Sequence, residues 1–88
     1  MKISDLNFVS ETPVTKTLKI GDNEYTVEIK QISFGDMEAA KGSSVALISR
    51  CVIFDGGQTL TEEQAARLDM QTAAQLTALI AEANAPKP

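Results

Sequence analysis

The sequence predicts an α+β fold, in which an N-terminal β-hairpin packs against three to four short α-helices. Two observations predict this fold. Residues 14–30 alternate apolar and polar side chains with the two-residue period of half-buried strands, whereas residues 34–84 repeat apolar side chains at helical spacing. An isolated hairpin is marginally stable in water, so its apolar face needs a cover, and only the helices can supply it.

The 88 residues suffice for one small domain, without room for a deep active site. We place this domain at residues 14–84, after an N-terminal arm of residues 1–13 and before a flexible tail of residues 85–88, where two prolines stop the preceding helix. The arm is either ordered or loose. Its apolar side chains are the candidate partner-binding residues, Ile3, Leu6, Phe8 and Val9.

The hairpin extends from Val14 to Gln31. Its turn falls at Gly21-Asp22-Asn23-Glu24, because Gly, Asp and Asn accept the left-handed backbone conformations that tight connections need. One face of the two strands is apolar and carries Val14, Leu18, Ile20, Tyr25, Val27 and Ile29. A hairpin edge leaves backbone groups unpaired, so we expect a homo-oligomer in which the arm is exchanged between copies.

Two helices are predicted next. The first runs from Phe34 to about Lys41, with Ser33 as its N-cap ahead of Asp36, and Gly42 ends it. The second begins at Ser43 or Ser44 and continues through Phe54, which makes it the most buried helix of the chain. Its apolar stripes comprise Val45, Ile48 and Val52, with Leu47, Cys51 and Phe54 beside them. Gly56-Gly57 is interpreted as a helix C-cap and turn.

A further helix starts at Thr61, because Thr61 and Gln64 have the spacing of a capping box. Beyond this start, apolar side chains recur at separations that fit one helical face, namely Leu68, Leu76, Leu79 and Ile80. The opposite side carries the polar residues Glu62, Glu63, Gln71, Gln75 and Glu82. Most of the aromatic side chains, Phe8, Tyr25, Phe34 and Phe54, are expected in the core.

Composition argues against an enzyme. The chain has no His, and we identify no catalytic, cofactor-binding or metal-binding residues and expect no cofactor. An EF-hand beginning at Asp55 needs Gly at its sixth position and a carboxylate at its twelfth, where the chain has Leu60 and Ala66. The single Cys51 favours a reduced intracellular compartment. A net charge of −4 disfavours nucleic acid and anionic membranes as partners, and no apolar run is long enough to cross a membrane.

The order of the predicted parts resembles the tail assembly chaperones of long-tailed bacteriophages. The resemblance covers residues 14–84, although 88 residues is short for that family. Its most specific part is the pattern V-x-x-D-G-G-x-x-L-T-x-E-x-A-x-x-L, carried by Val52, Asp55, Gly56, Gly57, Leu60, Thr61, Glu63, Ala65 and Leu68. The family offers no catalytic residues to transfer.

The resemblance implies a non-enzymatic factor in the host cell cytoplasm that binds and solubilises the tape measure protein. It also implies recruitment of the tail tube protein, mainly through a longer form made by ribosomal frameshifting, and absence from the mature virion. Two alternative hypotheses remain. The chain is alternatively a small structural virion subunit of the tail or connector, or a non-enzymatic interaction domain that regulates a host protein.

Overall fold

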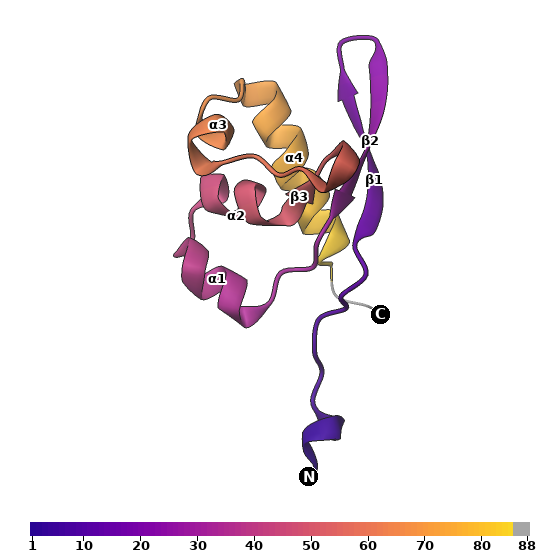
Figure 1. Cartoon of the computed structure of the whole chain (residues 1–88), viewed down its shortest axis with the longest axis vertical. Helices are drawn as coiled ribbons and strands as arrows, with labels where there is room; N and C mark the ends of the chain where they lie inside the picture. The colour runs from indigo at the N-terminus through magenta and orange to yellow at the C-terminus, as the bar shows by residue number, and fades with distance from the viewer. Residues whose placement is uncertain (86–88) are drawn as a thin grey trace.

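The computed structural model describes residues 1–85 and confirms an α+β fold (Figure 1). A hairpin stands beside a group of short helices, and the N-terminal arm leads away from the hairpin's open end. The predicted tail falls mainly on residues 86–88, which lie outside the described residues. In chain order the elements are η1 (Ile3–Asp5), β1 (Val14–Ile20), β2 (Asn23–Ile29), α1 (Phe34–Ala40), α2 (Ser44–Cys51), β3 (Val52–Ile53), η2 (Asp55–Gly57), α3 (Glu62–Ala66) and α4 (Met70–Ala83).

The predicted hairpin is confirmed. Strands β1 and β2 are antiparallel, with Val14 opposite Ile29 and Ile20 opposite Asn23, so the connection consists of Gly21 and Asp22 alone. Gly21 adopts a φ of 62°, a conformation that a residue with a Cβ reaches only at a cost. The predicted turn was therefore wider than the observed one. The alternating pattern places most polar side chains of the two strands on the exposed face, where Lys19 and Glu24 form an ion pair of 3.8 Å. Lys16 is on the helix-covered face and pairs with Glu82 of α4.

A third strand was not predicted. Helix α2 ends at Cys51, and Val52–Ile53 pair with β2 as an antiparallel edge, giving the sheet order β1-β2-β3. The predicted continuation of the helix to Phe54 was wrong. Short apolar runs fit both a helix and a strand, and β-branched Val52 and Ile53 favour the strand once β2 offers unpaired backbone groups. The amide of Lys30 donates to the carbonyl of Cys51 at 2.8 Å and begins this pairing.

The two glycines after β3 form a turn and not a helix C-cap, because they follow a strand. Gly56 and Gly57 have φ values of 75° and 76°, which lets the chain reverse within η2. The amide of Phe54 then donates to the carbonyl of Gln58 at 2.7 Å. This closed turn is the first half of the stretch that carries the family resemblance.

The segment from Thr61 forms two helices, which gives four α-helices among the described residues, within the predicted three to four. The capping box is confirmed, since the amide of Gln64 donates to Thr61 Oγ1 at 3.1 Å and the amide of Thr61 donates to Gln64 Oε1 at 3.0 Å. However, α3 ends at Ala66, and α4 begins after Asp69, whose carboxylate accepts from the amide of Thr72 at 2.7 Å. Asp is a strong N-cap, and it starts a new helix here instead of continuing the old one.

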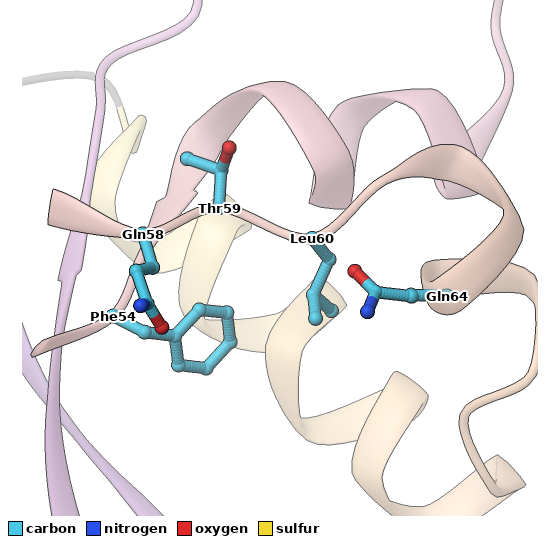
Figure 2. A pocket seen from close by; sticks show the side chains of 5 residues that line it. All are labelled: Phe54, Gln58, Thr59, Leu60 and Gln64. Carbon is cyan, nitrogen blue, oxygen red and sulfur yellow. The ribbon is translucent and has the colours of Figure 1, made fainter.

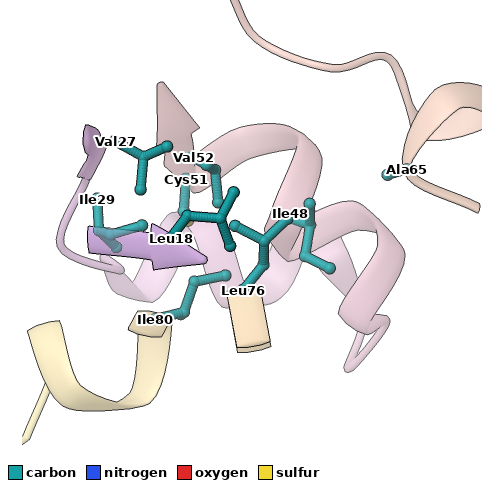
Figure 3. Close-up of a cluster of buried hydrophobic side chains, with 9 residues drawn as sticks. All are labelled: Leu18, Val27, Ile29, Ile48, Cys51, Val52, Ala65, Leu76 and Ile80. Atoms are coloured by element: carbon teal, nitrogen blue, oxygen red, sulfur yellow. The ribbon is translucent and has the colours of Figure 1, made fainter. Parts of the chain in front are cut away.

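The core lies between the sheet and the helices (Figure 3). Leu76 and Ile80 of α4 and Ile48 of α2 meet the inner face of the hairpin, as the predicted stripes require. Each fully buried aliphatic side chain contributes roughly 1.5–3 kcal/mol to stability. The buried cluster comprises Leu18, Val27, Ile29, Ile48, Cys51, Val52, Ala65, Leu76 and Ile80.

Candidate partner-binding surface

A buried carboxylate fixes helix α1 to the rest of the domain. The side chain of Asp36 is 2% exposed, and its oxygens accept hydrogen bonds from Lys30 Nζ at 3.2 Å and from Arg50 Nη2 at 3.1 Å. Its backbone position is set by a capping box with Ser33, in which both reciprocal bonds measure 3.1 Å. The Ser33 cap was predicted from the sequence, but the two cations, Lys30 after β2 and Arg50 on α2, were not.

Burial by itself raises the pKa of Asp36, because a carboxylate loses its hydration. The hydrogen bonds from the Ser33 amide, Lys30 and Arg50 outweigh this effect and lower the pKa to about 2. Asp36 is therefore ionised throughout the physiological range. Its role is structural, since it joins three elements and leaves the opposite side of α1 in solvent.

Most aromatic side chains are on the surface, so the expectation that they enter the core was wrong. Phe8 is 73% exposed and Phe34 is 82% exposed, while Tyr25 is about half-exposed and only Phe54 is partly buried. The reasons differ with position: the helices leave the turn end of the hairpin uncovered at Tyr25 (Figure 1), Phe8 belongs to the arm, and Phe34 lies on the outer side of α1. Exposed aromatic side chains in a small domain are characteristic of protein interaction surfaces.

The four arm residues that were predicted to bind a partner are all exposed. The arm has one turn of 3-10 helix, η1, and bends at Leu6, Glu11 and Thr12. Ser10 attaches it to the domain by donating its amide to Gln31 Oε1 at 2.8 Å. Phe8 and Val9 line a shallow hollow together with Ile32 and Ala83. Ile3 and Leu6 lie outside this hollow, so the structure brings together only two of the four residues.

A groove around Phe54 was not predicted. Its first half is a hollow of about 390 Å³, toward which the Phe54 ring, Leu60 and the Gln64 carboxamide point in Figure 2. The turn that holds Phe54 beside Gln58 forms one wall. The other wall is held in place because Ser49 Oγ donates to the carbonyl of Leu60 at 2.7 Å, which ties the loop before α3 to α2.

The second half of the groove lies under the end of the hairpin. It is a hollow of about 280 Å³, in which half-exposed Ile20 and Tyr25 face the same Phe54 and Gln58 that line the first half. We call the two adjoining hollows the Phe54 groove. Its lining residues are Leu18, Ile20, Tyr25, Thr26, Val27, Phe54, Asp55, Gln58, Thr59, Leu60 and Gln64.

The Phe54 groove combines an apolar floor with a few hydrogen-bonding groups. Its polar groups are mostly carboxamides and hydroxyls, and Asp55 is the single carboxylate in its lining. Such groups donate and accept hydrogen bonds around an apolar floor. Among residues 1–85, no group of three or more His, Cys, Asp or Glu side chains is gathered as metal ligands would be.

The thiol of Cys51 is fully buried between α2 and the sheet. Burial raises its pKa, and the nearby Asp36 carboxylate raises it further. The thiol is therefore a packed core group, as predicted. Within the part of the chain that the structure describes, no helix combines the length and apolarity needed to traverse a membrane.

Comparison with known proteins adds no relative. No family model, curated protein sequence or solved structure matches the chain.

Proposed function

We propose that this protein is a tail assembly chaperone of a long-tailed bacteriophage, which binds and solubilises the tape measure protein without catalysis. The Phe54 groove carries the proposal, because it is an open, largely apolar hollow in a domain whose exposed side chains include several large apolar residues. The stretch with the family resemblance, Val52 to Leu68, supplies Phe54, Gln58 and Leu60 to this groove. Of the motif residues themselves, Asp55 and Leu60 line the groove, so the stretch and the groove overlap in part.

The groove suits an amphipathic helix of the client. Its two hollows share Phe54 and Gln58 in their lining, so a helix laid across both can place one apolar side chain in each hollow. The carboxamides of Gln58 and Gln64 border the apolar floor and can hydrogen-bond to polar side chains at the edge of the helix stripe. A long helical client with repeated apolar stripes offers many such sites, so many copies can coat it.

The charge of the chaperone supports solubility of the complex. Each copy has a net charge of −4, so a client coated by many copies becomes strongly negative, and mutual repulsion opposes aggregation. Recognition depends on apolar contacts and only weakly on charge. In this proposal the protein acts in the host cytoplasm and leaves before the tail matures, while a longer frameshifted form recruits the tail tube protein.

Co-expression with the tape measure protein encoded nearby tests the proposal. The client is expected to move from the insoluble to the soluble fraction and to co-elute with the chaperone. Because the contacts are mainly apolar, the complex should persist at about 1 M salt, where the Debye length is about 3 Å. A client that stays insoluble, or a complex that dissociates at this salt concentration, contradicts the proposal.

A structural virion subunit is the second candidate, favoured by the exposed arm, since subunits of assemblies often reach neighbours through such segments. Mass spectrometry of purified particles separates the two functions. A chaperone is absent from mature particles, whereas a subunit is present in a fixed stoichiometry. The neighbouring genes separate both from the third candidate, regulation of a host protein, for which no tail genes are expected nearby.

A further inference from the structure

The outer edge of β1 is hydrogen-bonded to a side chain at Lys19 and, within the described part of the chain, has unpaired backbone groups at Thr15 and Thr17. Gln75 of α4 accepts from the amide of Lys19 at 2.8 Å and donates to the carbonyl of Lys19 at 2.6 Å. In an antiparallel sheet, alternate residues direct both backbone groups to the same side. Lys19 therefore faces away from β2, and so do Thr15 and Thr17. No hydrogen-bond partner is present for the outward backbone groups of Thr15 and Thr17 within residues 1–85.

Leu6 and Phe8 of the arm are two positions apart, as on one face of a strand. The chain bends at Glu11 and Thr12, between this stretch and β1, and the arm then leads away from the hairpin in Figure 1. Ser10 directs its amide toward Gln31, which follows β2, so Ser10 faces its own sheet. If the bend at Glu11 and Thr12 straightens, strand alternation directs the backbone groups of Val9 and Glu11 to the opposite side, which is the outer side of β1. The arm and β1 would then offer one long edge.

We propose that two copies of the chain exchange arms, each arm adding a strand to the outer edge of the other copy's β1. The two-fold axis passes between Pro13 of one copy and Pro13 of the other, and Pro13 lies between the arm and β1. The arm then runs antiparallel to the second copy's β1. The hydrogen-bonded pairs are Glu11 with Thr15, Val9 with Thr17 and Asn7 with Lys19.

The apolar pattern selects this register. The side chains between the hydrogen-bonded pairs point to the helix-covered face, where Phe8 is opposite Leu18 and Leu6 is opposite Ile20. A shift by two residues one way places Phe8 opposite Lys16. The shift the other way places polar Ser10 opposite Leu18. A shift by one residue turns both apolar side chains to the polar face of the sheet.

Helix α4 leaves room for the incoming side chains. Gln75 contacts Lys19, and Glu82 forms a 3.4 Å ion pair with Lys16, so this side of α4 lies along β1. Ala78 lies between Gln75 and Glu82 on the same side of the helix and is exposed. The Phe8 ring of the second copy can pack over this small side chain. The backbone of Asn7 takes the place of the Gln75 carboxamide at Lys19 and replaces its two hydrogen bonds.

The interface reaches the size that a stable dimer needs. A buried Phe side chain covers about 150–250 Å². With Leu6 and Phe8 from both arms, and with the surfaces that receive them, the exchange buries on the order of 1,200 Å², where stable interfaces begin. Pro13 weakens the centre of the ladder, since it has no amide hydrogen to donate. The incoming arm packs against Leu18 and Ile20, which also line the Phe54 groove. Sedimentation of the protein alone nevertheless tests the dimer separately from the chaperone function, because no client is present.

A pair of engineered cysteines tests the register. In the variant with Val9→Cys and Thr17→Cys, the two positions are opposite each other across the interface, with about 5.5 Å between Cα atoms, which a disulfide can bridge. Within one copy, roughly 26 Å of extended chain separates them, so any bond joins two copies. Oxidation should give a covalent dimer. The matched variant with Val9→Cys and Thr15→Cys, about 9 Å apart across the interface, should stay largely monomeric on denaturing gels.

Sedimentation of the full chain tests the exchange itself. The unaltered protein should be dimeric at high micromolar concentration, and Phe8→Ser should weaken the dimer by at least about tenfold, equivalent to about 1.4 kcal/mol. Ile3→Ser serves as the control, because Ile3 belongs to the same arm and is exposed but lies outside the paired stretch. A monomeric unaltered chain, an unaffected Phe8→Ser variant or equal cross-linking of the two cysteine pairs would each overturn the proposal.

Discussion

Arg50 Nη2 lies 3.1 Å from Asp36 Oδ1 and joins the last turn of α2 to the first turn of α1. Arg50 Nε approaches the same oxygen at 3.2 Å, so the guanidinium binds one carboxylate oxygen through two nitrogens. Lys30 Nζ approaches the other oxygen at 3.1 Å. Both cations stay partly hydrated, with 46% and 44% of their side chains exposed, so the cluster buries one charge and keeps two in water.

This cluster predicts an acid-sensitive fold. The pKa of Asp36 falls from 3.8 to about 2 on folding, so ionised Asp36 stabilises the native state. A depressed pKa gives stability that is complete above the unfolded value and is lost as pH falls through the folded value. The free energy of unfolding should therefore decrease by about 2 kcal/mol from this group between about pH 5 and pH 2. Urea titrations across this range measure it.

Asp36→Asn isolates that contribution. The amide keeps the shape of the side chain but does not titrate, so the variant should be less stable near neutral pH and should lose less stability on acidification. Both cations remain solvated in the variant. An identical pH dependence in the two proteins would show that Asp36 does not control acid unfolding.

The buried Cys51 thiol is expected to react slowly with alkylating reagents. Its raised pKa and complete burial keep the thiol protonated and shielded, so reaction with iodoacetamide should be slow in the folded protein and rapid in urea. The rate of labelling, followed by mass, should increase in parallel with unfolding. Fast labelling under native conditions would mean that α2 and the sheet open frequently.

Val52 was predicted in a helix and lies in strand β3. Its substitution tests the assignment of the core. It is fully buried opposite Ile29, so Val52→Asp places an unpaired carboxylate in the core and should cost several kcal/mol, on the order of 3 or more. Gln71→Asp is the control, since Gln71 is exposed on α4. Thermal melting of both variants checks the prediction. A Val52→Asp variant that melts within a few degrees of the parent contradicts the core assignment.

Asp69 marks the break between α3 and α4, and its removal tests the cap. Asp69→Ala eliminates the bond to the amide of Thr72 and should destabilise the domain by about 1 kcal/mol. Asp69→Asn should recover most of the loss, because Asn is an equally good N-cap. The two variants can be compared by chemical denaturation. Equal stability of Asp69→Ala and the parent would mean that the cap contributes nothing to α4.

Local signals predicted much of this fold. The hairpin was evident from alternation and from Gly21, and the starts of α1 and α3 were evident from Ser33 and Thr61, because each feature depends on residues only a few positions apart. The inner faces of the strands and of α4 followed from the same periodicities. The break at Asp69 was left open, because the predicted number of three to four helices allowed the segment after Thr61 to be one helix or two.

The remaining features depend on contacts between distant segments. Val52–Ile53 form a strand only because β2 has an open edge, and the Phe54 groove exists only because a turn after β3 meets the end of the hairpin. Neither arrangement is indicated by a pattern of neighbouring residues in the sequence. The exposure of Phe34 likewise depends on which side of α1 the Asp36 cluster holds inward.

The Phe54 groove yields the prediction that bears most directly on function. Phe54 forms part of both hollows, so Phe54→Ser removes the apolar surface between them and should abolish co-elution with the tape measure protein. The domain itself should lose roughly 2 kcal/mol, because the ring is only partly buried. Phe34→Ser is the matched control: it removes the same ring from an exposed position on α1, outside the groove, and should leave both stability and client binding nearly unchanged. Circular dichroism of both variants separates loss of binding from loss of structure. If folded Phe54→Ser still solubilises the client while Phe34→Ser does not, the client binds α1 and the groove has no part in its recognition.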